Sequence, residues 1–331
     1  MAEAGSESEQ SIHGQGHINP TLQFGKRLAA RRGVRCTLAV TRFVLAQSPP
    51  PAAGAGAVRV AAISDGCDRG GFDEAGEIAA YTARLEAAGS ATLGELLRSE
   101  SEQGRPVRAV VYDPFLPWAQ RVARRHGAAC AAFFTQPCAV DVAYGHAWAG
   151  RLVRPPLAAG GEPLELPGLP SGLTPRDMLT FLADPDDGAY LDLLVSQFRG
   201  LDTADHVFVN SFFELQPQES EYMASAWRAK TVDPTVPSAY LDNRLPDDSS
   251  YGFHLYTPMT TTTRSWLDTR AVRSVVYVSF GSLAPPNSVQ MAEVAEGLHN
   301  CGKAFLWVVR ASETSKIPDH FADKVKDRGL S

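Results

Sequence analysis

The sequence predicts an α/β protein in which doubly wound parallel sheets form two domains. Short apolar runs alternate with amphipathic stretches along the chain, the order expected when each parallel strand is followed by a crossover helix. The chain has 331 residues, which is long for a single core and suits two domains. Hydrophobic residues make up 44% of the chain and charged residues 21%, so its composition is that of a globular protein.

The expected strands of the first domain are short and rich in Val and Ala. They lie at 34–40, 58–63, 107–112, 128–134 and 206–210. The stretches between the strands have the length and amphipathic pattern of crossover helices. We expect these helices near 20–32, 73–101, 116–126, 136–150, 190–203 and 214–228.

A change in composition marks the boundary between the two domains. Residues 233–256 are rich in Pro, Asp, Ser and Tyr and show little periodicity, which is typical of an interdomain linker. We therefore place the first domain at 14–232, after a polar N-terminus at 1–13 that we expect to be disordered. A second domain follows at 257–331. Its expected elements are strands at 274–280 and 304–309 and a helix at 287–300. Two strands are too few for a sheet covered on both faces, so we expect this domain to be incomplete.

Charge, cysteine content and hydropathy narrow the classes of function. The net charge of -6 is modest, and no Lys/Arg-rich face stands out, which argues against a nucleic-acid partner. The 5 cysteines are scattered without a CxxC pair, which disfavours a disulfide framework or a zinc site and favours a reducing compartment. No signal-peptide pattern opens the chain, and no apolar run approaches the roughly 18 residues of a membrane span. We expect a cytoplasmic protein that binds small molecules and no membrane.

Three polar segments stand where ligands of open parallel sheets bind, at the carboxyl ends of strands. The first is GQGHINP at 14–20, a glycine loop that carries His17 and leads into a helix with proline in its first turn. The second is Asp113, directly after the strand AVVY. The third is the pair Gly281 and Ser282 at the end of a strand, where glycine admits a phosphate close to the backbone and serine adds a hydroxyl donor.

Each of these signals also has a purely structural interpretation. His17 could hydrogen-bond its own loop, and Asp113 could cap the next helix. GQGHIN lacks the third glycine of the dinucleotide fingerprint, and Val40 leads to Thr41 and Arg42 instead of an acidic residue, which disfavours a nicotinamide-dependent oxidoreductase. Several aromatic residues are expected to pack in the core: Phe115, Trp118, Phe133, Phe134, Tyr144 and Trp148.

Seven segments resemble, in order, those of the plant family 1 UDP-glycosyltransferases. They are GQGHINPTLQFGKRLAARRG, AISDGCDRGGF, VVYDPFLPWAQRVAR, FFTQPCAVDVAYGH, LPGLPSGLTPRDMLTFL, VFVNSFFELQPQE and VVYVSFGSLAPPNSVQMAEVAEGL. The resemblance runs almost throughout and is closest to the branch that glucosylates small acids and phenolics. It implies the GT-B architecture, two Rossmann-like domains facing across a cleft, with the acceptor bound mainly by the first domain and the nucleotide sugar mainly by the second.

The resemblance also implies roles for individual residues. By position, His17 corresponds to the general base and Asp113 to the carboxylate that holds its imidazole. The implied donor-binding residues are Gly16, Thr135, Gly281 and Ser282. UDP-glucose is then the co-substrate, and its glucose is transferred with inversion to a hydroxyl or carboxyl of a small-molecule acceptor, without a metal or other cofactor. We expect the protein to act as a monomer.

The sequence departs from the family pattern at both ends. The family places an apolar, central strand before the glycine loop, whereas SESEQSIH contains one aliphatic residue, Ile12, and the loss of that strand would leave neighbouring strands unpaired. The donor-binding signature has no counterpart before Ser331, and Asp233 stands where the family usually has glycine. We therefore expect a truncated chain without turnover. A non-catalytic acceptor-binding or vestigial fragment stays open as the alternative function.

Overall fold

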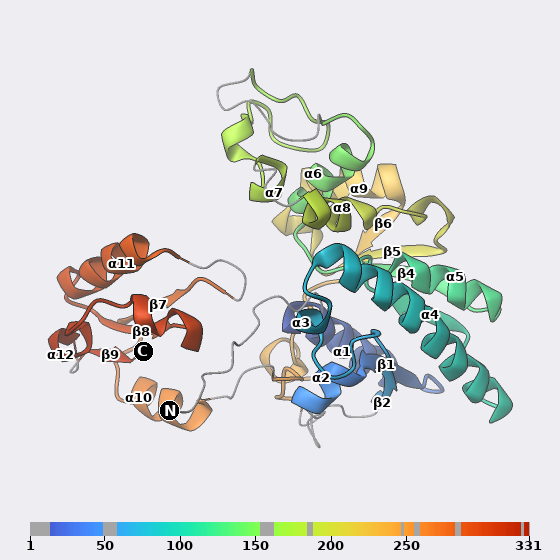
Figure 1. Ribbon diagram of the computed structural model, residues 1–331, viewed down its shortest axis with the longest axis horizontal. Coiled ribbons are helices and arrows are strands. Elements are labelled where there is room, and N and C mark those ends of the chain that lie inside the picture. The colour runs from blue at the N-terminus through green and yellow to red at the C-terminus, as the bar shows by residue number, and fades with distance from the viewer. Residues whose placement is uncertain are drawn as a thin grey trace. The chain divides into compact units, whose positions relative to one another are not determined.

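The computed structural model forms two compact units. It describes residues 14–48, 58–152, 162–183, 188–245, 248–254, 259–281, 286–325 and 328–330. The first unit spans Ile12–Leu255 and the second contains Tyr256–Ser331. Figure 1 shows that each is built of helices packed beside strands, in agreement with the predicted α/β class. The predicted disorder at 1–13 lies outside the described residues.

The strands of the first unit form two parallel sheets. One sheet pairs β1 (Cys36–Thr41) with β2 (Val58–Ile63). The other has the order β3-β4-β5-β6, with bounds Ala109–Tyr112, Ala129–Phe134, His206–Val209 and Ala229–Thr231. In the part of the chain that the structure describes, β1 pairs only with β2, and β3 only with β4. Within the described residues, the parallel strands of this unit are therefore divided into two sheets, with the division between β1 and β3.

Helix α1 (Gln15–Ala29) packs against both sheets of the first unit. It lies against β1 and β2, where its Leu22 joins a small core that also contains Val40, Val44, Val58 and Phe253. Phe24 from the same helix stacks on Phe133 of β4 at 5.0 Å between ring centroids. Because α1 contacts both sheets, it helps to hold the divided sheet together.

Helix α1 also begins earlier than the sequence predicted. Pro20 was expected in the first turn, but the helix starts at Gln15, so the proline lies inside it. Pro20 has no N–H to donate to the carbonyl of Gly16, four residues before it, and at this end of the helix that single loss is tolerated. The residues expected to form a glycine loop, including His17, are thus helical.

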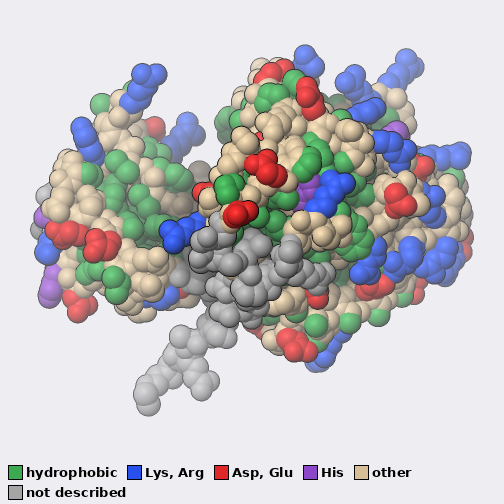
Figure 2. All heavy atoms as spheres, turned by 90° about the horizontal axis from the view of Figure 1, so that it is seen from above, with side chains coloured by type: hydrophobic (Ala, Val, Ile, Leu, Met, Phe, Trp, Pro, Cys, Tyr) green, Lys and Arg blue, Asp and Glu red, His purple; other side chains and the backbone are tan. Residues whose placement is uncertain are grey.

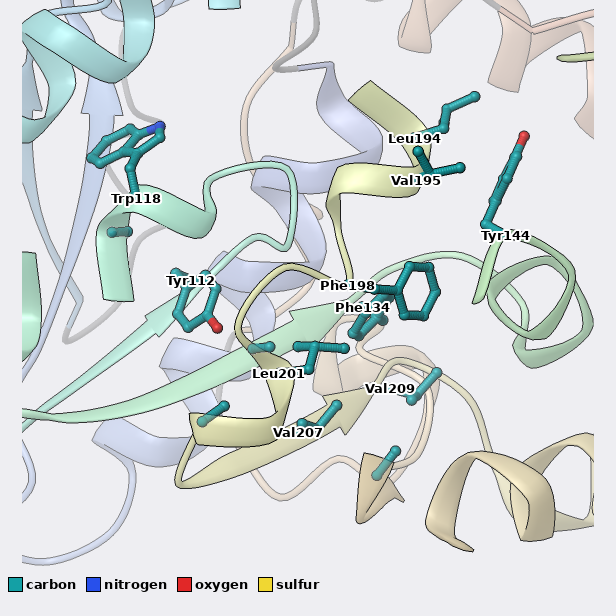
Figure 3. Close-up of a cluster of buried hydrophobic side chains, with 14 of the residues drawn as sticks. Tyr112, Trp118, Phe134, Tyr144, Leu194, Val195, Phe198, Leu201, Val207 and Val209 are labelled. Carbon is teal, nitrogen blue, oxygen red and sulfur yellow. The ribbon is translucent and has the colours of Figure 1, made fainter. Parts of the chain in front are cut away.

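The main core of the first unit lies between the four-stranded sheet and its helices. The remaining helices are α2 (Arg42–Gln47), α3 (Phe72–Ala75), α4 (Ile78–Glu102), α5 (Pro117–Arg125), α6 (Cys138–Trp148), α7 (Thr180–Ala183), α8 (Gly188–Ser196) and α9 (Pro217–Trp227). Buried residues of α4, α5, α6, α8 and α9 meet those of β3, β4 and β5 in one cluster. Figure 3 shows Phe134 of β4 beside Phe198, with Tyr112 and Trp118 in the same cluster.

Several elements differ from the sequence-based expectation for physical reasons. The helix expected at 190–203 ends at Ser196, and Gly200 then adopts a left-handed φ of 80°. β6 was not among the predicted strands, because a run of three residues is too short to show the pattern of a strand. Trp148 was expected in the core, but 43% of it is exposed, because it is the last residue of α6.

The second unit contains one small parallel sheet and its own core. The sheet has the order β7-β8-β9, with bounds Val275–Ser279, Ala304–Val308 and Gly329–Leu330. The helices are α10 (Thr260–Asp268), α11 (Ser288–Asn300) and α12 (Phe321–Val325). Trp307 and Phe305 of β8 are buried against Met291 of α11 and Phe321 of α12. Other hydrophobic side chains of this unit are exposed, Tyr277 at 65%, and green side chains lie on its surface in Figure 2.

None of the helices in the described ranges is long and apolar enough to cross a membrane.

Candidate functional site

His17 and Asp113 form the centre of the candidate site. His17 lies in the first turns of α1, and Asp113 directly follows β3. Nδ1 of His17 lies 2.7 Å from Oδ2 of Asp113, and 25% of the histidine side chain and 14% of the aspartate side chain are exposed. The other carboxyl oxygen, Oδ1, accepts a hydrogen bond of 2.9 Å from the backbone N–H of Phe115. This backbone bond fixes the carboxylate that faces the imidazole.

Thr135 and Phe115 complete the surroundings of the imidazole. Thr135 directly follows β4, the parallel neighbour of β3, so the carboxyl ends of both strands meet at one edge of the sheet. Its Oγ1 lies 3.1 Å from Nδ1 of His17. The ring of Phe115 meets the imidazole edge to face, with 5.1 Å between centroids. Phe115 packs against the main core, as expected, and its ring also contacts the site.

The charge of Asp113 determines the protonation behaviour of His17. Burial lowers the pKa of His17, but the charge of Asp113 and its hydrogen bond together outweigh burial, so the pKa is raised above 6.5. A neutral imidazole that donates from Nδ1 to the carboxylate carries its lone pair on Nε2. No described residue forms a hydrogen bond with Nε2. That nitrogen is available to accept a proton from a bound molecule.

A second carboxyl group lies buried close to this pair. Asp141, in the first turn of α6, has no exposed surface, and neither of its oxygens has a hydrogen-bond partner among the described residues. Burial raises its pKa well above 3.8, and the charge of Asp113 adds to the effect. Asp141 was not predicted as a site residue, because a carboxylate in the first turn of a helix ordinarily indicates only a favourable interaction with the helix dipole.

The other residues predicted to bind a donor lie in different parts of the chain. Gly16 precedes it in α1, and the position of a Cβ there has no atom within 4 Å. Gly281 belongs to the second unit and adopts a φ of 72°, a conformation that favours glycine. Ser282 lies outside the described residues. Within the first unit, the structure brings together His17, Asp113 and Thr135, and Gly16 directly precedes His17 in α1. Among the described residues, no group of three or more His, Cys, Asp or Glu side chains could hold a metal ion.

Comparison with known proteins gives close relatives over most of the chain. No family model matches it. UDP-glucosyltransferase UGT13248 of Hordeum vulgare subsp. vulgare is 49% identical over 319 residues, which cover 96% of this chain and 66% of that protein. UDP-glycosyltransferase 79 of Oryza sativa subsp. japonica is 47% identical over 325 residues, 96% of this chain and 68% of that protein. The chain thus spans about two thirds of the length of these curated relatives.

Solved structures show the same fold. The crystal structure of Os79 from O. sativa in complex with UDP superposes with a TM-score of 0.83 at 46% identity, over 96% of this chain and 70% of that one. A structure of Phytolacca americana UGT2 gives a TM-score of 0.70 at 26% identity. Both matches extend across the first and the second unit, since they cover 96% of this chain. The architecture predicted from the resemblance, GT-B, is therefore confirmed.

Proposed function

Because the chain belongs to the plant family 1 UDP-glycosyltransferases, we propose that it serves the transfer of glucose from UDP-glucose to a hydroxyl group of a small molecule. The observation that carries this proposal is the contact of 2.7 Å between His17 and Asp113. It leaves Nε2 of His17 without a partner among the described residues, on a side chain that is 25% exposed. We assign His17 as the general base.

In the proposed reaction, the acceptor oxygen attacks C1 of glucose as its proton passes to Nε2 of His17. The bond between C1 and the diphosphate oxygen breaks, and UDP leaves with the electron pair. Attack from the face opposite UDP inverts the anomeric centre. Asp113 stabilises the imidazolium that forms, and general-base assistance of this kind is typically worth about 10²–10⁴ in rate. One relative is named a UDP-glucosyltransferase and another is crystallised with UDP, which supports a UDP-sugar as the co-substrate.

The paired base favours a hydroxyl acceptor over a carboxyl acceptor. A carboxylic acid is already ionised near neutral pH and needs no base, whereas an alcohol or phenol must lose its proton during attack. Rice Os79 has been crystallised with a trichothecene and with deoxynivalenol-3-glucoside. Another relative is named flavonol 7-O-beta-glucosyltransferase. These names fit hydroxyl acceptors, and a carboxylic acid stays as the second acceptor class.

Four residues are proposed to bind the donor. Thr135, 3.1 Å from Nδ1 of His17, and Gly16, in the turn that carries His17, are assigned to the glucose side. Gly281 and Ser282 are assigned to the diphosphate, where backbone N–H groups and a hydroxyl would bind its oxygens. What supports these assignments is the position of each residue in the family pattern.

The test combines transfer with binding. The chain is incubated with UDP-glucose and a panel of phenols, alcohols and aromatic acids, and glucosylated products are sought by mass spectrometry. The same panel is titrated into the protein while the imidazole signals of His17 are followed by NMR. We expect hydroxyl compounds to shift those signals, and any transfer to vanish in His17→Ala. Acceptor binding without transfer would favour the acceptor-binding alternative. Transfer at an equal rate in His17→Ala would refute the assigned base.

A further inference from the structure

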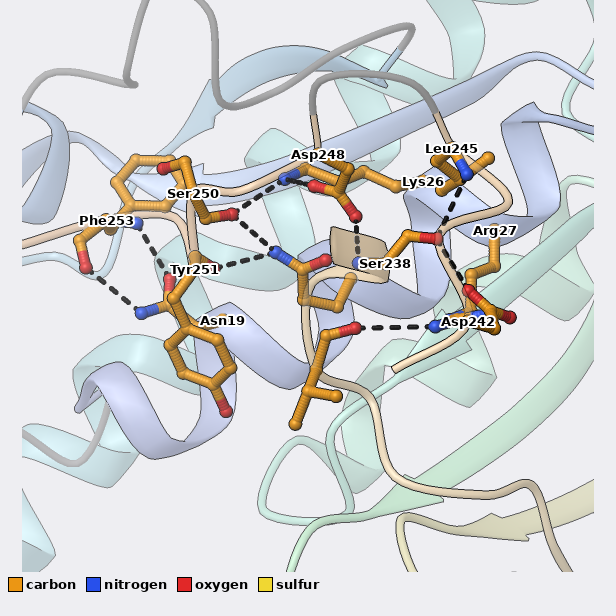
Figure 4. A network of polar contacts seen from close by, with 12 residues as sticks. Asn19, Lys26, Arg27, Ser238, Asp242, Leu245, Asp248, Ser250, Tyr251 and Phe253 are labelled. Carbon is orange, nitrogen blue, oxygen red and sulfur yellow. Dashed lines mark hydrogen bonds and ion pairs between the residues drawn. The ribbon is translucent and has the colours of Figure 1, made fainter. Parts of the chain in front are cut away.

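A segment from the end of the first unit lies along the helix that carries His17. We call the described residues 236–245 and 248–253 the strap. Four residues of α1 face it at the spacing of one side of a helix, and each hydrogen-bonds to it (Figure 4): Asn19, Gln23, Lys26 and Arg27. The sequence predicted this segment as a linker with little regular structure. Its irregular backbone is instead fixed by polar contacts with a helix more than 200 positions earlier.

The contacts between the strap and α1 continue along the helix from Arg27 toward His17. At the far end of α1, Arg27 bonds to Asp242 at 2.9 Å. One residue nearer, Lys26 forms an ion pair of 2.8 Å with Asp248, and the two side chains are only 6% and 7% exposed. Gln23 then donates to the backbone carbonyls of residues 250 and 251, at 3.0 and 2.9 Å. The strap is therefore attached along most of the length of the helix.

The contact nearest to His17 uses both polar groups of one side chain. Nδ2 of Asn19 donates to the carbonyl of Phe253 at 3.0 Å, and the N–H of Phe253 donates to Oδ1 of Asn19 at 2.8 Å. Asn19 and Phe253 are both fully buried. The ring of Phe253 packs in the small core beside Leu22 and Val40. Two hydrogen bonds and a buried ring thus hold the strap at a point two residues after the histidine.

A glycine allows this close approach. Gly252 has a φ of 134°, and a Cβ at this position would lie 2.4 Å from Oδ1 of Asn19 and 3.0 Å from Cδ2 of Leu22. Any side chain here would push the strap away from the helix, and the backbone conformation itself favours glycine. The strap and α1 therefore fit together only with a residue that lacks a Cβ.

We propose that Asn19 is a positioning residue for His17. Its two hydrogen bonds with the backbone of Phe253 fix the start of α1, so that Nδ1 of His17 reaches Asp113. The need for such an anchor follows from the local structure. Gly14, the N-cap residue, has no side chain to hold the first turn, and Pro20 removes one hydrogen bond of the next. Helix ends without these interactions fray. The inference rests on the proposed function for the chemical role of His17, but its geometry is tested without catalysis.

The test measures the pKa of His17 by NMR in the complete chain, with the signal assigned by its loss in His17→Ala. Asn19→Ala removes both hydrogen bonds to the backbone of Phe253. Gly252→Ala disturbs the same hydrogen bonds, because its Cβ would collide with the side chain of Asn19. Both are expected to lower the pKa of His17, since contact with Asp113 is what raises it. Arg27→Gln is the matched control. It breaks a strap contact roughly 15 Å along the helix from His17 and should leave the pKa unchanged.

The outcomes separate positioning from general stability. A pKa equal to that of the wild type in both Asn19→Ala and Gly252→Ala would overturn the proposal. An equal fall in Arg27→Gln would also overturn it, because the effect would then come from loosening the strap as a whole. If circular dichroism shows that Asn19→Ala is unfolded, Asn19→Ser and Gly252→Ala provide the answer. A failure here leaves the base assignment intact, since that assignment depends on the transfer and binding test of His17→Ala.

Discussion

Nδ1 of His17 and Oδ2 of Asp113 lie 2.7 Å apart although the residues are 96 positions apart in the sequence. Two different elements make this contact, the first turns of α1 and the end of β3. The carboxylate is in turn fixed by the backbone N–H of Phe115. The pair therefore depends on how α1 is held against the sheet, and its electrostatic coupling can be measured directly.

Asp113→Asn should lower the pKa of His17 below 6.5. In the wild type, burial lowers this pKa while the charge and the hydrogen bond of Asp113 raise it. The amide keeps the shape of the side chain and can still accept from the N–H of Phe115, but it removes the charge, so burial becomes the dominant influence. An NMR titration of the imidazole measures the change. If the pKa of His17 stays above 6.5 in the variant, a group other than the Asp113 carboxylate must be raising it.

The same pair should make the stability of the wild type depend on pH. A histidine whose pKa is raised on folding contributes stability that is fully present below its unfolded pKa, near 6.5, and that is lost as pH rises through the folded value. The advantage of the wild type over Asp113→Asn in free energy of unfolding should therefore shrink across this range. An advantage that grows with pH would contradict the assigned sign.

The sequence predicted much of this site because its signals are local. Asp113 follows an apolar strand directly, whereas Thr135, which follows the next strand of the same sheet, was predicted only from the family resemblance. Polar residues at the ends of adjacent parallel strands meet at one edge of the sheet. The family resemblance then connected His17 to them. Strand positions were predicted for the same reason, since each strand is a short apolar run.

The remaining features depend on contacts between distant residues. Asn19 and Phe253 are 234 positions apart, and nothing in the composition of the strap indicates which of its carbonyls an amide will meet. Gly252 appeared in the sequence only as one glycine in an irregular segment. The buried oxygens of Asp141 were equally hidden, because a lack of partners becomes visible only when the surrounding side chains are in place.

Asp141→Asn should stabilise the protein at neutral pH and have little effect near pH 4. Burial, aided by the charge of Asp113, raises the pKa of Asp141 well above 3.8. The stability contributed by such a group is present below its unfolded pKa and is lost as pH rises through the folded one. The amide of Asn cannot ionise, so the variant does not lose this stability as the pH rises. The charge of Asp141 also raises the pKa values of Cys138 and Tyr144, so both should be lower in the variant.

Thermal unfolding of both proteins over a series of pH values measures this effect. The difference in Tm between Asp141→Asn and the wild type should be smallest at acidic pH and should rise steadily toward neutral pH. If the curves of Tm against pH are parallel for the two proteins, the charge of Asp141 must be stabilised by a partner. That result would contradict the lack of a hydrogen-bond partner for its oxygens among the described residues.

Gly145→Ala should destabilise the first unit by about 1–3 kcal/mol, the usual cost of overpacking a core. Gly145 lies within α6, and a Cβ there would lie 2.3 Å from Cη2 of Trp227 and 3.2 Å from Cε1 of Phe198. The indole is large and is packed against Phe198, so it cannot move aside without disturbing the core. Alanine is ordinarily the better helix former by roughly 1 kcal/mol, and this gain is too small to offset the collision.

Gly94→Ala is the matched control, because Gly94 lies inside α4 of the same unit. A Cβ there would meet Nε2 of His126 at 3.7 Å and Cγ1 of Val122 at 3.9 Å, which is ordinary packing distance. This variant should gain about 0.5–1 kcal/mol from the lower entropy of the unfolded chain. Chemical denaturation measures both changes. Destabilisation by both substitutions, or by neither, would show that the contact with Trp227 does not determine the tolerance of α6 for a side chain at this position.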